Sequence, residues 1–155
     1  MNLSSAAQTS TTVPISAPRI RVITLGLIKH CDRLLVSEGY DTIKQQQFFR
    51  ALGGGVEFGE TSVEALQREF WEEIQAELTN IHYLGCIENL FVYEGKPKHE
   101  LIQLYQCDFA DEALYQKEVI IGNEGGEPFT ATWVECDRLS AGELRLMPEE
   151  CRKFL

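Results

Sequence analysis

Three consecutive glycines followed by one strongly patterned helix constrain the fold of this chain more than any other feature. Gly53, Gly54 and Gly55 lie shortly before Thr61 and Glu64, which have the T-x-x-E spacing of a capping box. This box predicts that a helix begins at Thr61 or Ser62. The apolar residues that follow recur with helical spacing and share one narrow face, which we predict to lie against the core. They are Val63, Leu66, Phe70 and Ile74.

Three carboxylates of the same helix lie beside this apolar face rather than opposite it. Glu69 and Glu73 are four residues apart, and Glu72 completes the cluster. Like charges at these spacings repel one another, and a bound cation removes the conflict. Carboxylate oxygens suit Mg²⁺ or Mn²⁺, which keep water ligands and add phosphate oxygens. The simpler alternative is a solvated acidic face, but the adjacent glycines and the position beside the core count against it.

Arg68 stands within this carboxylate cluster. Helical spacing lets it reach Glu64 or Glu72, and it can also turn back toward Glu60. In the simpler interpretation it forms a surface ion pair that contributes little to stability. In the functional interpretation it fixes the carboxylates, while a glycine carbonyl approaches the ligand closely.

The rest of the chain predicts a mixed sheet with helices on its faces, an α/β (α+β) class. Apolar runs predict strands at residues 19–28, 34–36, 48–52, 84–92, 99–109 and 130–134. Residues 39–47 are interpreted as a polar loop, 94–98 as a hairpin turn, and 111–126 as ambiguous. Pro148 suits the first position of a closing helix over residues 149–155.

Composition and charge limit the binding partners and the cellular location that we expect for this chain. The 155 residues carry a net charge of −10, which disfavours bulk binding to nucleic acid or to anionic membranes. We expect residues 1–18 to be a disordered tail and residues 19–155 to form a single domain, without a membrane span. Five scattered cysteines without CxxC spacing predict no disulfide framework or zinc site, and indicate a reducing cytoplasm.

The glycine and helix segment resembles the Nudix box, Gly-x5-Glu-x7-Arg-Glu-U-x-Glu-Glu-x-Gly-U, where U is a bulky apolar residue. The matching residues here are Gly54, Glu60, Arg68, Glu69, Phe70, Glu72 and Glu73. The final glycine of the box is Gln75, the last apolar position is Ala76, and Leu52 replaces a frequent proline. The loss of the glycine affects the helix exit but removes no proposed ligand. The resemblance implies a Nudix fold over residues 19–155.

The resemblance implies Mg²⁺-dependent hydrolysis of a nucleoside diphosphate linked to another group, with Mn²⁺ able to substitute. It assigns Glu69, Glu73, Glu72 and the Gly54 carbonyl to the metal. Arg68 and Glu60 are expected to orient the carboxylates. Glu124 is the best positional match for the general base in MutT-like members. Glu127 and Glu100 remain rivals, and a solvated loop acid is the simpler interpretation of Glu124.

Substrate choice is less constrained. Phe91 stands where ADP-ribose hydrolases of the family often carry a proline, and Tyr93 falls where its diadenosine polyphosphate hydrolases often carry a tyrosine. We assign Phe49, Arg50 and Tyr93 to substrate binding, although a hairpin tyrosine more often packs within its strand. Phe48 and Tyr40 could also stack on a base, but either Phe48 or Phe49 must fill the core. A nucleoside triphosphate is another candidate substrate, and a homodimer is an expectation from the resemblance. The alternatives are a non-catalytic nucleotide-sensing module and an unrelated acidic scaffold.

Overall fold

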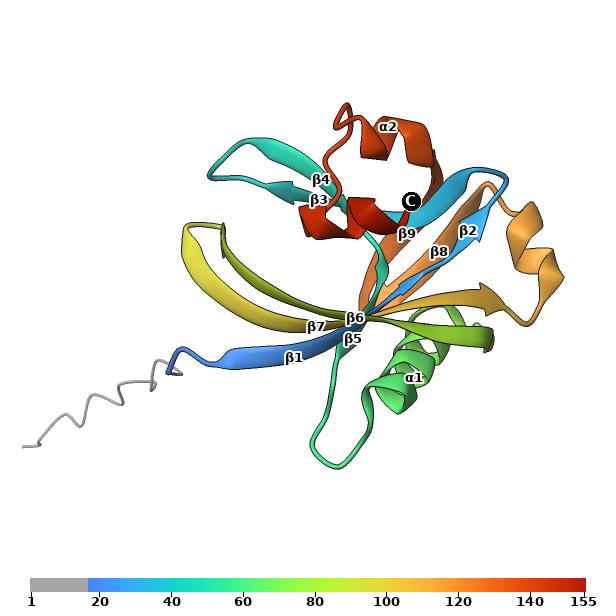
Figure 1. Cartoon of the computed structure of the whole chain (residues 1–155), viewed down its shortest axis with the longest axis horizontal. Helices are drawn as coiled ribbons and strands as arrows, with labels where there is room; N and C mark the ends of the chain where they lie inside the picture. Colours follow the sequence, from blue (N-terminus) through green and yellow to red (C-terminus); the bar gives the residue numbers. More distant parts are fainter. Residues whose placement is uncertain (1–16) are drawn as a thin grey trace, which may run out of the picture.

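The computed structural model describes residues 17–155, so the predicted tail lies outside the described residues up to residue 16. The strands form two sheets (Figure 1). The first sheet is mixed, in the order β5 (Leu52–Gly55), β1 (Ile20–Leu27), β7 (Lys96–Phe109) and β6 (Leu78–Tyr93). The second is antiparallel, in the order β2 (Lys29–His30), β3 (Arg33–Asp41), β9 (Glu127–Glu135) and β8 (Val119–Glu124), with β4 (Gln46–Arg50) paired to β3.

Helices cover the sheets on opposite sides, which confirms the predicted α+β class. The helix α1 (Ser62–Ile74) contacts β8, β5 and β1, so it touches strands of both sheets. A second short helix, α2 (Cys136–Ser140), and the 3₁₀ turn η2 (Glu149–Phe154) lie on the other side (Figure 1). One apolar cluster lies under α1 and another under α2 and η2. Within residues 17–155, no helix is long and apolar enough to cross a membrane.

The predicted helix is confirmed at both its start and its buried face. Thr61 is the N-cap, and it forms the reciprocal capping box with Glu64. Leu66 and Phe70 are fully buried on the face predicted to meet the core. The helix ends at Gln75, which adopts the left-handed conformation (φ 54°, ψ 38°) that the missing glycine would favour. The exit geometry expected for the family box is therefore retained without the glycine.

Two sequence interpretations before the helix are wrong. Residues 39–47, interpreted as a loop, belong largely to the β3–β4 hairpin, in which Gly39 pairs with Phe48. Residues 48–52, interpreted as one strand, divide between β4 and β5, which lie in different sheets. The glycines that follow lie in a strand, because β5 pairs with β1 through Gly53, Gly54 and Gly55. The chain thus passes from one sheet to the other at Ala51, directly before the glycines.

Several elements after the helix also differ from those predicted from the sequence. The ambiguous residues 111–126 contain the 3₁₀ turn η1 (Glu112–Gln116) and then β8. The closing helix is a 3₁₀ turn, and Pro148 is its N-cap rather than its first residue. The predicted strands of residues 84–92 and 99–109 are extended into the long β6–β7 hairpin.

Candidate active site

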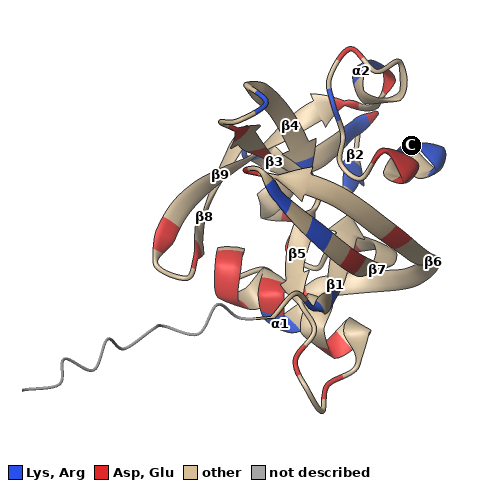
Figure 2. Cartoon of the chain, turned by 90° about the vertical axis from the view of Figure 1, so that its left-hand side faces the viewer, with Lys and Arg blue, Asp and Glu red and all other residues tan. Residues whose placement is uncertain are grey.

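The site is a cavity of about 220 Å³ at the point where the chain changes sheets. We call it the acidic cavity, because Glu73, Glu100 and Glu124 line it together with Arg50 and Gly54. These residues come from α1, β7, β8, β4 and β5. Figure 2 shows acidic residues of α1 beside the acidic end of the β8–β9 hairpin. Strands of both sheets and one helix therefore bring negative charge to a single hollow.

Arg68 is the centre of the carboxylate network. Its Nε and Nη2 donate to the two oxygens of Glu60 at 3.1 and 2.7 Å, which is a bidentate pair. Its Nη1 donates to Glu69 at 2.9 Å and to Glu72 at 3.2 Å, and Nη2 also reaches the Gly55 carbonyl at 2.9 Å. These bonds lower the pKa of Glu60 below its usual value and raise the pKa of Arg68. The arginine therefore links the glycine strand to the first carboxylates of the box.

Glu64 does not join this network, because its carboxylate caps the backbone N–H of Thr61 at 2.7 Å. Of the partners weighed for Arg68, Glu60 and Glu72 are thus engaged and Glu64 is not. Glu72 is the most exposed carboxylate of the set, with 57% of its side chain accessible.

Gly54 makes room for Glu69. A Cβ at Gly54 would lie 2.3 Å from the carboxyl carbon of Glu69, so any side chain there would displace the carboxylate. Thr24 on β1 is the strand partner of Gly54, and its buried hydroxyl has no hydrogen-bond partner among the residues described. The glycine at this position thus permits the close approach of helix and strand that the box requires.

Glu73 is the buried carboxylate of the site. It is 8% exposed, and among residues 17–155 its carboxylate takes part in no hydrogen bond or ion pair. Burial, followed by the charges of Glu124, Glu69 and Glu72, raises the pKa of Glu73 to about 8. A buried carboxylate without a donor is costly, and a cation at this position would offset that cost.

The three candidates for the general base have different surroundings. Glu124, at the end of β8, lines the acidic cavity and is close enough to Glu73 to raise its pKa. Its strand partner Glu127 is exposed and does not line the cavity. Glu100 lines the cavity but is bound to Arg50 at 2.8 Å, with Arg21 at 3.9 Å. Of the three, Glu124 and Glu100 line the acidic cavity, and Glu100 is held in an ion pair with Arg50.

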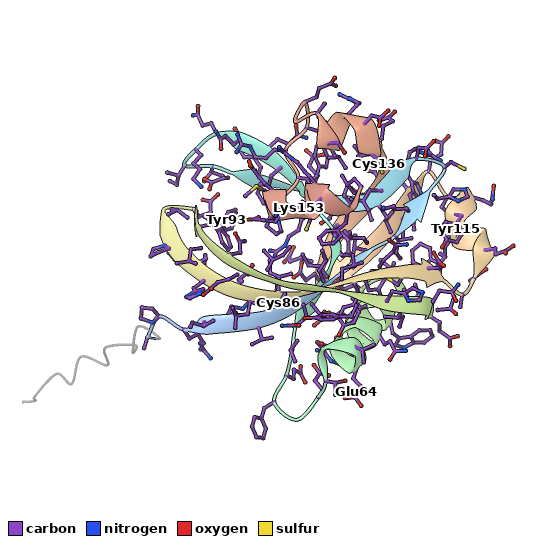
Figure 3. All side chains as sticks on the ribbon, viewed as in Figure 1. Glu64, Cys86, Tyr93, Tyr115, Cys136 and Lys153 are labelled. Carbon is purple, nitrogen blue, oxygen red and sulfur yellow. The ribbon has the colours of Figure 1, made fainter. Side chains whose placement is uncertain are left out.

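A second cavity, of about 270 Å³, adjoins the first and shares Arg50 with it. We call it the aromatic cavity, because Phe48, Phe91 and Tyr93 contribute to its lining. Tyr93 lies at the end of β6, on the side that faces the β3–β4 hairpin (Figure 3). Phe48 and Tyr93 meet edge to face, with ring centroids 6.0 Å apart. Two of the predicted substrate residues, Arg50 and Tyr93, therefore lie together here.

Phe49 is the exception among the predicted substrate residues. It is 8% exposed and packs in the core under α2 and η2, and it does not line the aromatic cavity. Its neighbour Phe48 lines the cavity instead, because successive residues of a strand point to opposite faces. The burial of Phe49 contradicts its assignment to substrate binding, and Phe48 is the phenylalanine of this strand that lines the cavity.

The sequence pattern did not reveal Asn89, Asp41 and Lys44, which also line the aromatic cavity. Strand register brings them there from β6, from the end of β3 and from the turn after β3. No local spacing marks them, since each depends on pairing across two hairpins.

The carboxylates of the site are chemically suited to a divalent cation, although they are not arranged around a common point. Within residues 17–155, no group of three His, Cys, Asp or Glu side chains is close enough to hold a metal ion. Glu69 is turned toward Arg68, while Glu73 faces the cavity with Glu124. A buried, unpartnered carboxylate among further carboxylates nevertheless matches the hard oxygen donors that Mg²⁺ prefers.

The fold of this chain is similar to those of several solved structures. A NUDIX hydrolase from Nitrosomonas europaea has a TM-score of 0.60 and 18% identity, covering 84% of this chain and 82% of its own. A MutT protein from Bacillus halodurans has a TM-score of 0.60 and 19% identity, covering 86% and 79%. A MutT NUDIX hydrolase from Burkholderia pseudomallei has a TM-score of 0.57 and 20% identity, covering 77% and 85%. These likenesses show the fold.

The family itself is shown by the sequence model of the NUDIX domain, which matches residues 18–154. That range includes every residue of the Arg68 network and both cavities. The chain therefore belongs to the NUDIX family of hydrolases, which act on pyrophosphate bonds.

Proposed function

We propose that this protein is a Mg²⁺-dependent pyrophosphohydrolase that cleaves a nucleoside diphosphate linked to another group. The observation that carries the proposal is Glu73, a buried carboxylate without a hydrogen-bond donor at the wall of the acidic cavity. The charges that raise its pKa are those of Glu124, Glu69 and Glu72, so a cation is favoured here. Mn²⁺ is expected to substitute, because it accepts the same oxygen ligands.

Glu69, Glu72 and Glu73 would hold the metal, with the Gly54 carbonyl as a further donor from β5. The bound ion supplies charge neutralisation for the pyrophosphate and activation of water. Arg68 holds Glu69 and Glu72, and Glu60 fixes Arg68 through the bidentate pair. Arg68 and Glu60 therefore act by orienting carboxylates, and not by contact with the substrate.

Glu124 is the proposed general base. It lines the acidic cavity across from α1, so it can accept a proton from a water placed between the hairpin and the helix. Its rivals are disfavoured by their surroundings, since Glu127 lies outside the cavity and Glu100 is paired with Arg50.

The aromatic cavity is proposed to hold the nucleoside part of the substrate. Phe48, Phe91 and Tyr93 offer ring surfaces to a planar base. Arg50 lines both cavities, which supports a role for its guanidinium in binding phosphate oxygens between the base and the metal. This arrangement supports nucleoside triphosphates and dinucleoside polyphosphates as the first compounds to test.

The test is incubation of the purified protein with Mg²⁺ or Mn²⁺ and a panel of nucleotide derivatives. The panel contains nucleoside triphosphates, oxidised triphosphates, nucleotide sugars, ADP-ribose, NADH and diadenosine polyphosphates, with products separated by chromatography. Glu73→Gln is run beside Glu77→Gln, a control at an exposed glutamate just after the helix. We expect one compound class to be hydrolysed, with turnover lost in Glu73→Gln and retained in the control.

Hydrolysis that survives in Glu73→Gln would contradict the metal site. A nucleotide that raises the melting temperature without being hydrolysed would instead favour a sensing module. We also infer a cytoplasmic location from the unpaired pattern of the five cysteines, which cell fractionation checks. A homodimer stays a prediction, and sedimentation of the purified protein measures it.

A further inference from the structure

The tips of the β3–β4 and β6–β7 hairpins are joined by reciprocal hydrogen bonds, although more than fifty residues separate them. Asp41, 3% exposed, accepts bonds from the backbone N–H groups of Ile43, Lys44 and Glu94 at 3.0, 2.9 and 3.2 Å. In return, Glu94 accepts the backbone N–H of Thr42 at 2.6 Å and also the Thr42 hydroxyl. We call Asp41, Thr42 and Glu94 the hairpin clasp.

The clasp adjoins the aromatic cavity. Asp41 and Lys44 line this cavity from the first hairpin, and Tyr93, the residue before Glu94, lines it from the second. Lys44 strengthens the connection, since its ammonium donates to the Val92 carbonyl and lies 3.7 Å from Asp41. The two hairpins lie one above the other at the same end of the molecule (Figure 1).

The aromatic rings are fixed by the same two hairpins. Phe48 lies across Gly39, where a Cβ would come 2.3 Å from the ring, so its position depends on the β3–β4 pairing. The edge of that ring meets Tyr93 of the other hairpin. The separation of the hairpin tips therefore sets the separation of Phe48 and Tyr93.

We propose that Asp41 and Glu94 are positioning residues that hold the aromatic cavity at the width of a planar base. They act through Phe48 and Tyr93 and do not touch the reacting phosphates. This inference rests on the proposed function, because it assumes that a nucleoside occupies the aromatic cavity. A fixed cavity loses less conformational freedom when the ligand binds, so the clasp contributes to affinity for the nucleoside half.

The test compares Glu94→Ala with Glu94→Gln, which keeps an acceptor oxygen for Thr42. Glu88→Ala is the control, since Glu88 is an exposed acid on β6 that bonds His99 within its own hairpin. Thr42→Val is a second, milder variant. For each protein we measure kcat and KM with the best substrate of the panel. Calorimetry gives the dissociation constants of AMP, GMP and magnesium pyrophosphate.

For Glu94→Ala we expect KM and the nucleoside monophosphate dissociation constant to rise about tenfold. We expect kcat and pyrophosphate affinity to stay within about twofold, because the acidic cavity is unchanged. Glu94→Gln should recover most of the loss, and Glu88→Ala should match the wild type. Exchange of the backbone N–H groups of residues 42 and 94 should accelerate in Glu94→Ala without any ligand, which checks the clasp directly.

Equal loss of AMP and pyrophosphate binding would overturn the inference, since it would mean general damage to the protein. Unchanged monophosphate binding in Glu94→Ala would also overturn it. If the wild type binds AMP or GMP but hydrolyses nothing, the proposed function fails while a selective loss in Glu94→Ala still supports the clasp. If the wild type binds neither monophosphate, the inference is wrong whatever the protein hydrolyses.

Discussion

The carboxylate of Glu69 lies directly over Gly54, where a Cβ would stand 2.3 Å from its carboxyl carbon. Gly54 does not have a left-handed backbone conformation. Glycine is required at this position because a side chain would occupy the space of the Glu69 carboxylate. Gly53 is different, because it has a φ of 150° and a Cβ there would stand 2.0 Å from the Thr24 carbonyl oxygen. Two adjacent glycines of β5 thus serve separate needs, one of the site and one of the strand.

Gly54→Ala should therefore lower activity with little loss of stability. The added methyl group meets the end of a flexible side chain, so Glu69 moves away from Arg68 at low cost. We expect kcat/KM to fall by about tenfold or more, as for other changes that misplace metal ligands. Gly53→Ala should instead destabilise the fold by at least about 2 kcal/mol. Thermal melting and steady-state kinetics of both variants would separate the two effects, and equal melting temperatures would contradict this division.

Arg68→Lys should impair catalysis more than its conserved charge suggests. The guanidinium contacts Glu60, Glu69, Glu72 and the Gly55 carbonyl at once, and an ammonium cannot reproduce the bidentate pair with Glu60. We expect kcat/KM to fall by about 10- to 100-fold in saturating Mg²⁺. Arg138→Lys, which alters an exposed arginine bonded to Glu143, is the matched control and should leave kinetics unchanged. Wild-type kinetics in Arg68→Lys would show that the orientation of the carboxylates does not depend on the bidentate contacts of the guanidinium.

The helix and its carboxylates could be predicted from sequence because their signals are local. The capping box of Thr61 and Glu64 and the apolar face at Leu66 and Phe70 all lie within a few turns of one helix. The Arg68 contact with Glu72 follows from the same helical spacing, and Glu60 is within reach because it lies just before the helix. For these features the spacing limits the possible contacts to a few, although it does not exclude Glu64, which caps Thr61 instead of joining Arg68.

The remaining features depend on pairing between distant strands. Phe48 and Phe49 are both apolar, and only the register of β4 against β3 decides which one lines the cavity. The contact of Arg50 with Glu100 joins residues 50 apart, and nothing near either residue marks it. Residues 39–47 have the polar composition of a loop, yet hydrogen bonds to the neighbouring strand make most of them a hairpin.

Gln75→Gly should stabilise the protein. Gln75 holds a left-handed conformation at the end of α1, with its backbone N–H bonded to Phe70 and Trp71 carbonyls. This conformation costs free energy for a residue with a Cβ, whereas glycine adopts it without that cost. We expect a gain of about 0.5–1 kcal/mol, or roughly 2–4 °C in melting temperature. Gln75→Ala keeps the Cβ and is the control, with no gain expected. A lower melting temperature in Gln75→Gly would show that the Gln75 side chain makes a stabilising contact in solution.

Glu73→Gln should stabilise the metal-free protein while it abolishes activity. The pKa of Glu73 is raised from 4.5 to about 8, chiefly by burial. Between these values the folded protein binds a proton that the unfolded chain does not, so the free energy of unfolding falls as pH rises through this window. Between pH 4.5 and pH 7 the free energy of unfolding therefore falls by about 3 kcal/mol. In chelator, the variant should therefore melt above the wild type at pH 8, and the difference should shrink toward pH 5.

Added Mn²⁺ should make the wild type melt above Glu73→Gln at pH 8. A cation in the acidic cavity binds the ionised carboxylate of Glu73, so metal raises the melting temperature of the wild type at pH 8. Gln cannot carry the charge, and the same addition should leave Glu73→Gln nearly unchanged. Glu77→Gln, at an exposed site after the helix, should respond like the wild type. A full metal-induced shift in Glu73→Gln would place the ion elsewhere, because the buried charge would then have no part in holding it.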